Sequence, residues 1–196
     1  IIRDSLSRLP IPKRMRWADQ PHEFVRPLRW VLGLFGNTVL ECEIYGITAG
    51  NTTRGHRFHC PEPIEVREPR DYLEQLRSPG YVIGDFDERR TRIREDVERV
   101  AAQLGQRVVI DPVLLDEVTA LTEWPVAIAG SFDQEFLEVP DQALIATMKI
   151  NQKYFHLVDE QGELLPRFIA VANLASSAPE SVRHGNERVV RPRLAD

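Results

Sequence analysis

The longest helical pattern in this sequence covers residues 85–104 and sets the first condition on the fold. Apolar residues recur there at helical spacing: Ile93, Val97, Val100, Ala101 and Leu104. Gly105 follows directly and is a common helix stop. The other face carries acids four residues ahead of bases, which is typical of a solvated helix face. We therefore expect a helix that packs on the rest of a domain through one face.

Segments rich in β-forming residues lie on both sides of this helix and predict antiparallel pairs. Residues 28–35 and 38–45 are joined by Gly36-Asn37, which is a strong hairpin signal. Residues 153–158 and 166–172 are joined through residues 159–162. Three shorter strands are expected at residues 61–66, 108–110 and 125–129. Helices interspersed with antiparallel pairs predict an α+β fold, with a mixed, largely antiparallel sheet and helices packed on it.

Proline, aspartate and glycine mark the remaining elements. Further helices are expected at residues 69–76, 112–121 and 141–149, and from about 179 to Pro192. Residues 5–9 read as the end of a helix, 13–27 as an ordered loop and 50–55 as a turn-rich stretch. We expect three parts: an N-terminal linker over 1–27, an α+β core over 28–178, and a basic C-terminal helix over 179–196 that leads into a further domain.

Composition limits the class of protein. The chain has 196 residues and a formal net charge of −5, which by itself argues against nucleic-acid binding. No apolar run approaches the roughly 20 residues that span a bilayer. Cys42 and Cys60 are the only cysteines, which fits a reducing cytoplasm. The sequence starts with Ile1 and ends inside a patterned segment, so we expect an internal fragment of a longer cytoplasmic protein.

Three local clusters of basic residues are candidates for contact with a nucleic acid. The first is residues 53–59, where Arg54, His56 and Arg57 surround Gly55, with Phe58 as a stacking surface. The alternative is a loop whose arginines pair with nearby acids. A metal site made of His56, His59 and Cys60 lacks a fourth ligand at any usual spacing.

The second cluster is residues 147–155, at an expected junction between a helix and a strand. It combines basic, amide and aromatic side chains that suit a sugar–phosphate backbone or a base: Lys149, Gln152, Lys153 and Tyr154. The alternative is a surface junction at which the aromatic residues anchor the strand.

The third cluster is the C-terminal helix. Its candidate phosphate contacts are Arg188, Arg191 and Arg193, with His184 near the same face. Ion pairing with another domain or subunit is the alternative.

Common enzyme motifs are absent. The sequence has no Gly-x-x-x-x-Gly-Lys, Gly-x-Gly-x-x-Gly or Gly-x-Ser-x-Gly. Asp116, Glu117 and Glu123 are acids near Trp124, and such positions are more often solvated than catalytic. We expect no catalytic residue and no metal ligand in this chain.

Six blocks, in order along nearly the whole chain, resemble the beta subunit of the bacterial two-subunit glycyl-tRNA synthetases. They are residues 11–17 (IPKRMRW), 23–27 (EFVRP), 53–58 (TRGHRF), 123–126 (EWPV), 147–149 (TMK) with 152–155 (QKYF), and 185–196 (GNERVVRPRLAD). The resemblance implies an enzyme of two alpha and two beta chains, in which the alpha chain uses ATP and Mg²⁺ to activate glycine. It implies that the beta chain recognises glycine tRNA and carries an HD-type domain and an anticodon-binding domain beyond this segment.

The region at hand is similar to the editing-type domain of the phenylalanyl-tRNA synthetase beta chain. The leading hypothesis is a tRNA-contacting auxiliary domain of the ligase. One alternative is hydrolysis of mischarged tRNA, for which His56 and Glu123 are local candidates. The other is a structural spacer that supports subunit assembly, which the acidic net charge favours.

Overall fold

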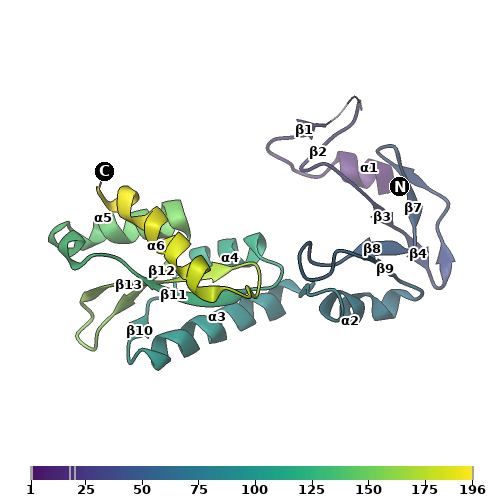
Figure 1. Ribbon diagram of the computed structural model, residues 1–196. Helices are drawn as coiled ribbons and strands as arrows, with labels where there is room; N and C mark the ends of the chain where they lie inside the picture. The colour runs from purple at the N-terminus through teal and green to yellow at the C-terminus, as the bar shows by residue number, and fades with distance from the viewer. Residues whose placement is uncertain (1, 18, 20, 196) are drawn as a thin grey trace. The chain divides into compact units, whose positions relative to one another are not determined.

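The computed structural model of the protein describes residues 2–17, 19 and 21–195. The chain forms two compact units, residues 1–80 and residues 81–196, here called unit 1 and unit 2. Figure 1 shows the helices and strands of each unit. Mixed helices and antiparallel sheets confirm the predicted α+β class.

Unit 2 is organised around a four-stranded antiparallel sheet in the order β10-β12-β13-β11. Its strands are β10 (Arg107–Val108), β11 (Val126–Ser131), β12 (Phe155–Val158) and β13 (Leu164–Ala172). β11 and β13 pair from Val126↔Ala172 to Ser131↔Arg167, and β12 and β13 form the predicted hairpin.

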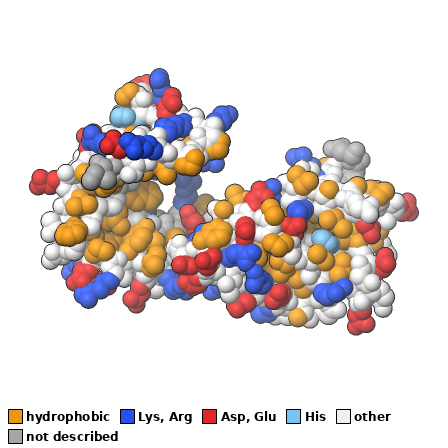
Figure 2. Space-filling view, turned by 180° about the vertical axis from the view of Figure 1, so that it is seen from behind, with side chains coloured by type: hydrophobic (Ala, Val, Ile, Leu, Met, Phe, Trp, Pro, Cys, Tyr) orange, Lys and Arg blue, Asp and Glu red, His pale blue; other side chains and the backbone are white. Residues whose placement is uncertain are grey.

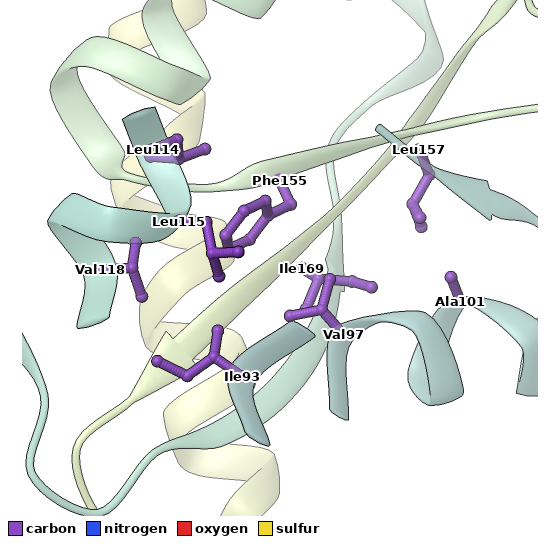
Figure 3. Close-up of a cluster of buried hydrophobic side chains, with 9 residues drawn as sticks. All are labelled: Ile93, Val97, Ala101, Leu114, Leu115, Val118, Phe155, Leu157 and Ile169. Carbon is purple, nitrogen blue, oxygen red and sulfur yellow. The ribbon is translucent and has the colours of Figure 1, made fainter. Parts of the chain in front are cut away.

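Helices α3 (Phe86–Gln103) and α4 (Pro112–Leu121) pack on one face of this sheet. The Asp85 and Asp111 carboxylates cap them by accepting the backbone N–H of Glu88 at 2.8 Å and of Leu114 at 2.9 Å. Figure 3 shows the resulting cluster of buried side chains: Ile93, Val97, Ala101, Leu114, Leu115, Val118, Phe155, Leu157 and Ile169. The predicted apolar face of the long helix is confirmed.

A second buried cluster gathers around Phe168, next to Ile169 on β13. Neighbouring strand residues point to opposite faces, so this cluster lies across the sheet from the first. It is built with α5 (Asp141–Ala146), η3 (Thr147–Gln152), the short helix η2 (Gln134–Glu138) and α6 (Pro179–Ala195). Its buried members are Leu144, Met148, Tyr154, Leu164, Phe168, Ala170 and Val190. Unit 2 therefore has a sheet between two helical layers.

Unit 1 is made of short strand pairings and short helices. The hairpins are β1 (Met15–Arg16) with β2 (Glu23–Phe24), β4 (Leu34–Phe35) with β5 (Thr38–Val39), and β8 (Thr52–Arg54) with β9 (Pro63–Glu65). β7 (Ile47–Gly50) lies between β3 (Val31–Leu32), which is parallel to it, and β6 (Glu43–Ile44), which is antiparallel. The helices are α1 (Ile2–Ser7), η1 (Pro69–Asp71) and α2 (Tyr72–Arg77).

Several expected boundaries differ in the structure. The hairpin at Gly36-Asn37 pairs only two residues on each side, because β3 pairs with β7 instead of extending it. Residues 50–55, expected to be turns, include β8, and the expected loop 13–27 contains β1 and β2. Helix α6 continues past Pro192 to residue 195.

The division between the units falls at residue 80, inside the range 28–178 that we expected to form one core. The physical reason is strand pairing. Strands β3–β9 pair only among themselves, and so do β10–β13. Both buried apolar clusters lie wholly in unit 2. Within the described residues, no helix is both long and apolar enough to cross a membrane.

Candidate nucleic-acid interface

The loop over residues 53–59 is held together by His56. This side chain is only 2% exposed, and its Nδ1 accepts the backbone N–H groups of Phe58 at 3.3 Å and His59 at 3.4 Å. The His56 backbone N–H donates to the Gly80 carbonyl at 2.7 Å. A Cβ on Gly55 would lie 2.4 Å from that same oxygen, so only glycine fits there. His56 therefore shapes the loop from inside.

The cations of this loop lie on its surface. Arg54 and Arg57 are exposed, and Phe58 is 71% exposed. Arg54 Nη1 donates to the Pro61 carbonyl at 3.4 Å. Arg57 and Phe58 thus present a cation and a ring face next to each other at the loop surface.

Both lysines of the 147–155 cluster are engaged by acids of the α4 segment. Lys149 Nζ binds Asp111, the cap of α4, and Lys153 Nζ lies 2.6 Å from Glu117. The Lys149 hydrogen bond and the Leu114 N–H hold the pKa of Asp111 below its ordinary value. These pairs tie η3 and the residue after it to α4, so both lysines already have an acidic partner within unit 2.

Tyr154 is also part of the interior. It is 6% exposed and stacks on Phe168, with ring centroids 4.5 Å apart and planes 7° apart. Its hydroxyl donates to Asn186 Oδ1 at 2.7 Å. Burial raises its pKa to about 12. Gln152 is half-buried beside it, in a cavity of about 210 Å³.

Arginines from β13 and α6 gather around Ser131 at the end of β11. A cavity of about 530 Å³ has a lining that includes His184, Arg188 and Arg191. A second cavity of about 210 Å³ has a lining that includes Arg167 and Arg183. Both cavities are lined by Ser131 and Glu187, so they adjoin. We call this set the arginine site: Arg167, Arg183, Arg188 and Arg191, around Ser131 and Glu187.

The acidic side chains near the arginine site already have hydrogen-bond or ion-pair partners within unit 2. Glu187 Oε1 accepts the backbone N–H of Ser131 at 3.0 Å and its hydroxyl at 3.1 Å. Asp133 pairs with Arg191, and Glu180 pairs with Arg183 at 2.5 Å.

Arg167 and Arg188 have no ion pair among the described residues. The site therefore holds two cations that can each present a guanidinium fork to a ligand.

The sequence identified only part of this site. Arg188 and Arg191 were predicted, whereas Arg193 is exposed on α6 but lines neither cavity. Arg167 was missed because only the strand register, which places it opposite Ser131, brings it to α6. An isolated arginine in a strand carries no signal of this kind.

The acids near Trp124 are occupied in other ways. Asp116 pairs with Arg90 on α3, and Glu117 pairs with Lys153. The Glu123 backbone N–H donates to Asn173 Oδ1 at 2.6 Å, while its carboxylate is exposed. Across the part of the chain that the structure describes, no group of three or more His, Cys, Asp or Glu side chains is placed to hold a metal ion.

Comparison with known proteins supports the resemblance along the whole chain. The family model described as glycyl-tRNA synthetase beta subunit matches residues 1–196. The chain is 56% identical to the glycine–tRNA ligase beta subunit of Hahella chejuensis, 55% to that of Pseudomonas aeruginosa and 54% to that of Stutzerimonas stutzeri. Each comparison covers all of this chain and 28% of the relative. The chain therefore belongs to the glycyl-tRNA synthetase beta subunit family and corresponds to a segment of its longer members.

Proposed function

We propose that this chain is an auxiliary tRNA-contacting region of a glycine–tRNA ligase beta subunit. In this role it supports the ATP-dependent attachment of glycine to its tRNA. The observation that carries the proposal is the arginine site, where two arginines without an acidic partner face adjoining cavities. The activity and the partners of the longer protein are part of the proposal, because this chain spans 28% of its relatives.

The arginine site suits a phosphodiester backbone. A guanidinium offers planar, paired N–H donors that match phosphate oxygens, and it keeps its charge at any physiological pH. The larger cavity, about 530 Å³, is in the size range of small-ligand sites. Two adjoining cavities with arginines along them fit successive phosphates better than a single small anion.

The surface loop with Arg57 and Phe58 is a second point of contact in the proposal. An exposed ring accepts an unpaired base by stacking, and a neighbouring arginine accepts the attached phosphate. This contact belongs to unit 1 and the arginine site to unit 2, so each can be tested separately.

The partners proposed for the longer protein are glycine tRNA and a glycyl-tRNA synthetase alpha subunit, in an assembly of two alpha and two beta chains in the cytoplasm. Glycine activation with ATP and Mg²⁺ is assigned to the alpha subunit. Asp85 and Asp111 cap helices, Asp116 and Glu117 form ion pairs, and His56 shapes its loop, which supports a contacting role for this region.

The test is tRNA affinity in the full-length beta chain assembled with its alpha subunit. Replacing Arg167 and Arg188 by Ala removes two phosphate contacts, and we expect roughly tenfold weaker binding with a shallower salt dependence. The matched control is Arg99→Ala, since Arg99 is exposed on α3 of the same unit and pairs with Asp96. Unchanged tRNA affinity in a folded Arg167/Arg188 variant would remove the arginine site from the proposal.

An alternative function is hydrolysis of mischarged tRNA, which follows from the proposed likeness to the editing-type domain of the phenylalanyl-tRNA synthetase beta chain. The cavity of about 210 Å³ beside Tyr154 is the observation that favours it. Its lining includes the polar residues Gln152, Lys153 and Asn186. Incubating the full enzyme with alanyl- or seryl-charged glycine tRNA tests it, and no deacylation above background rules it out.

The remaining alternative is a spacer that supports subunit assembly. In that case the Arg167/Arg188 variant binds tRNA normally, and deletion of this region abolishes assembly with the alpha subunit. Sedimentation of the two co-expressed subunits measures that outcome.

A further inference from the structure

Positive charge is concentrated at the N-terminal end of this acidic chain. Residues 1–30 hold seven Lys and Arg against three Asp and Glu, a net charge of +4. Because the whole chain has a net charge of −5, residues 31–196 carry −9. Such an asymmetry is typical of segments that bind a polyanion.

Five of these cations belong to β1, β2 and the residues beside them. We call this segment the basic hairpin, and its cations are Lys13, Arg14, Arg16, Arg26 and Arg29. Figure 2 shows Lys and Arg side chains gathered over this part of unit 1. All five residues are exposed.

The basic hairpin is anchored within unit 1. The rings of His22 and Phe24 lie 5.5 Å and 5.6 Å from the ring of Tyr45, at the turn between β6 and β7. Arg14 Nη2 donates to the Ser7 carbonyl at 2.8 Å, which joins the hairpin to α1. These contacts fix the backbone of the hairpin and the side chain of Arg14, which lowers the entropy cost of binding at this segment.

No cation of the basic hairpin has an ion pair among the described residues. Arg16 lies opposite Glu23 in the β1–β2 register, yet no ion pair forms between them. Other arginines of unit 1 behave differently, since Arg67 pairs with Glu65 and Arg70 pairs with Glu68.

We propose that the basic hairpin is a binding surface for the phosphodiester backbone of RNA, separate from the arginine site. This proposal rests on the proposed function, because the RNA is taken to be the tRNA of the ligase. It adds a second contact surface for that tRNA. Charge complementarity carries the assignment: the hairpin and its flanks present five cations without acidic partners. Trp30, which is 42% exposed and follows Arg29, adds a flat apolar surface for a base.

The experiment measures tRNA binding by the full-length beta chain assembled with its alpha subunit, across a series of salt concentrations. We expect the Arg16→Ala/Arg26→Ala variant to bind roughly tenfold more weakly. The slope of log K against log salt should become shallower by about 1.4 to 1.8, which is the loss of two phosphate contacts. The matched control is Arg67→Ala/Arg70→Ala, which removes two exposed arginines of the same unit that already have acidic partners.

The charge-conserving variant Arg16→Lys/Arg26→Lys separates charge from folding, and it should keep most of the affinity and the salt slope. If the alanine variant assembles and binds tRNA like the wild type, the proposal is overturned. It is also overturned if the alanine variant no longer assembles with the alpha subunit but keeps its affinity for tRNA. In that case the hairpin contacts protein and not RNA.

The Arg167→Ala/Arg188→Ala variant is measured beside these. A defect in that variant alone supports the proposed function and rejects the basic hairpin as a tRNA contact. A defect in the hairpin variant alone supports the basic hairpin as a tRNA contact and rejects the arginine site as one.

Discussion

The Tyr154 hydroxyl donates a hydrogen bond to Asn186 Oδ1 at 2.7 Å and so joins the start of β12 to α6. Asn186 also donates from Nδ2 to the Val182 carbonyl, one turn earlier in the same helix, at 2.7 Å. The second bond orients the Asn186 side chain, and the first holds the helix that carries Arg188 and Arg191. A residue that the sequence marked as a nucleic-acid contact is thus a support for the arginine site.

Removing this hydroxyl should weaken the fold. We expect Tyr154→Phe to lower the free energy of unfolding by about 1 to 2 kcal/mol, because a partly buried acceptor loses its donor. Urea unfolding measures the change. In a double-mutant cycle with Asn186→Ala, the two effects should couple, and strict additivity would contradict the contact.

Acid should weaken the link between Asp111 and Lys149. The Lys149 hydrogen bond lowers the pKa of Asp111 in the folded state, so its stabilisation is present above the ordinary value of 3.8 and is lost as the pH falls below it. Asp111→Asn keeps an N-cap but lacks the charge. Thermal unfolding at a series of pH values should show the wild-type advantage over Asp111→Asn shrinking below pH 3.8. A constant difference across that range would be evidence against this account.

The lysines of the 147–155 cluster should matter to folding more than to tRNA. Replacing Lys149 and Lys153 by Ala should cost about 1 kcal/mol or less per pair, because both pairs are partly solvated. The affinity of the assembled enzyme for tRNA should fall much less than in the Arg167/Arg188 variant. If tRNA affinity fell as much as in the Arg167/Arg188 variant, the two lysines would be part of the tRNA-contacting surface.

Two glycines should respond to alanine in opposite directions. A Cβ on Gly130 would lie 2.5 Å from the Phe168 ring, so Gly130→Ala should destabilise unit 2 by about 1 to 3 kcal/mol. A Cβ on Gly185 meets open space within α6, and Gly185→Ala should stabilise by about 0.5 to 1 kcal/mol. Chemical unfolding of the two variants, measured in parallel, checks both signs.

Residues 81–196 should fold as an independent unit. Both buried apolar clusters and the whole four-stranded sheet lie in this range. We expect one cooperative urea transition that coincides when followed by far-ultraviolet circular dichroism and by tryptophan fluorescence. Transitions that differ between the two probes would mean that unit 2 needs unit 1.

The sequence by itself determined the elements whose signals are local. The helical spacing around Ile93 and Val97, the helix that begins after Asp111, and the hairpin of β12 with β13 were all predicted from nearby residues and confirmed. The family was likewise identified from blocks of sequence alone, without the structure.

Tertiary structure decided which charges remain available to a ligand. In the sequence, Lys149 and Lys153 are candidate phosphate contacts of the same kind as Arg188. In the folded chain, α4 packs beside η3 and places an acidic partner next to each lysine. Arg167 joins α6 only through the pairing of β13 with β11. For these cations, the availability to a ligand depends on acidic residues that are distant in sequence. Such residues come close to a cation only when the chain folds, so the sequence alone does not reveal the pairing.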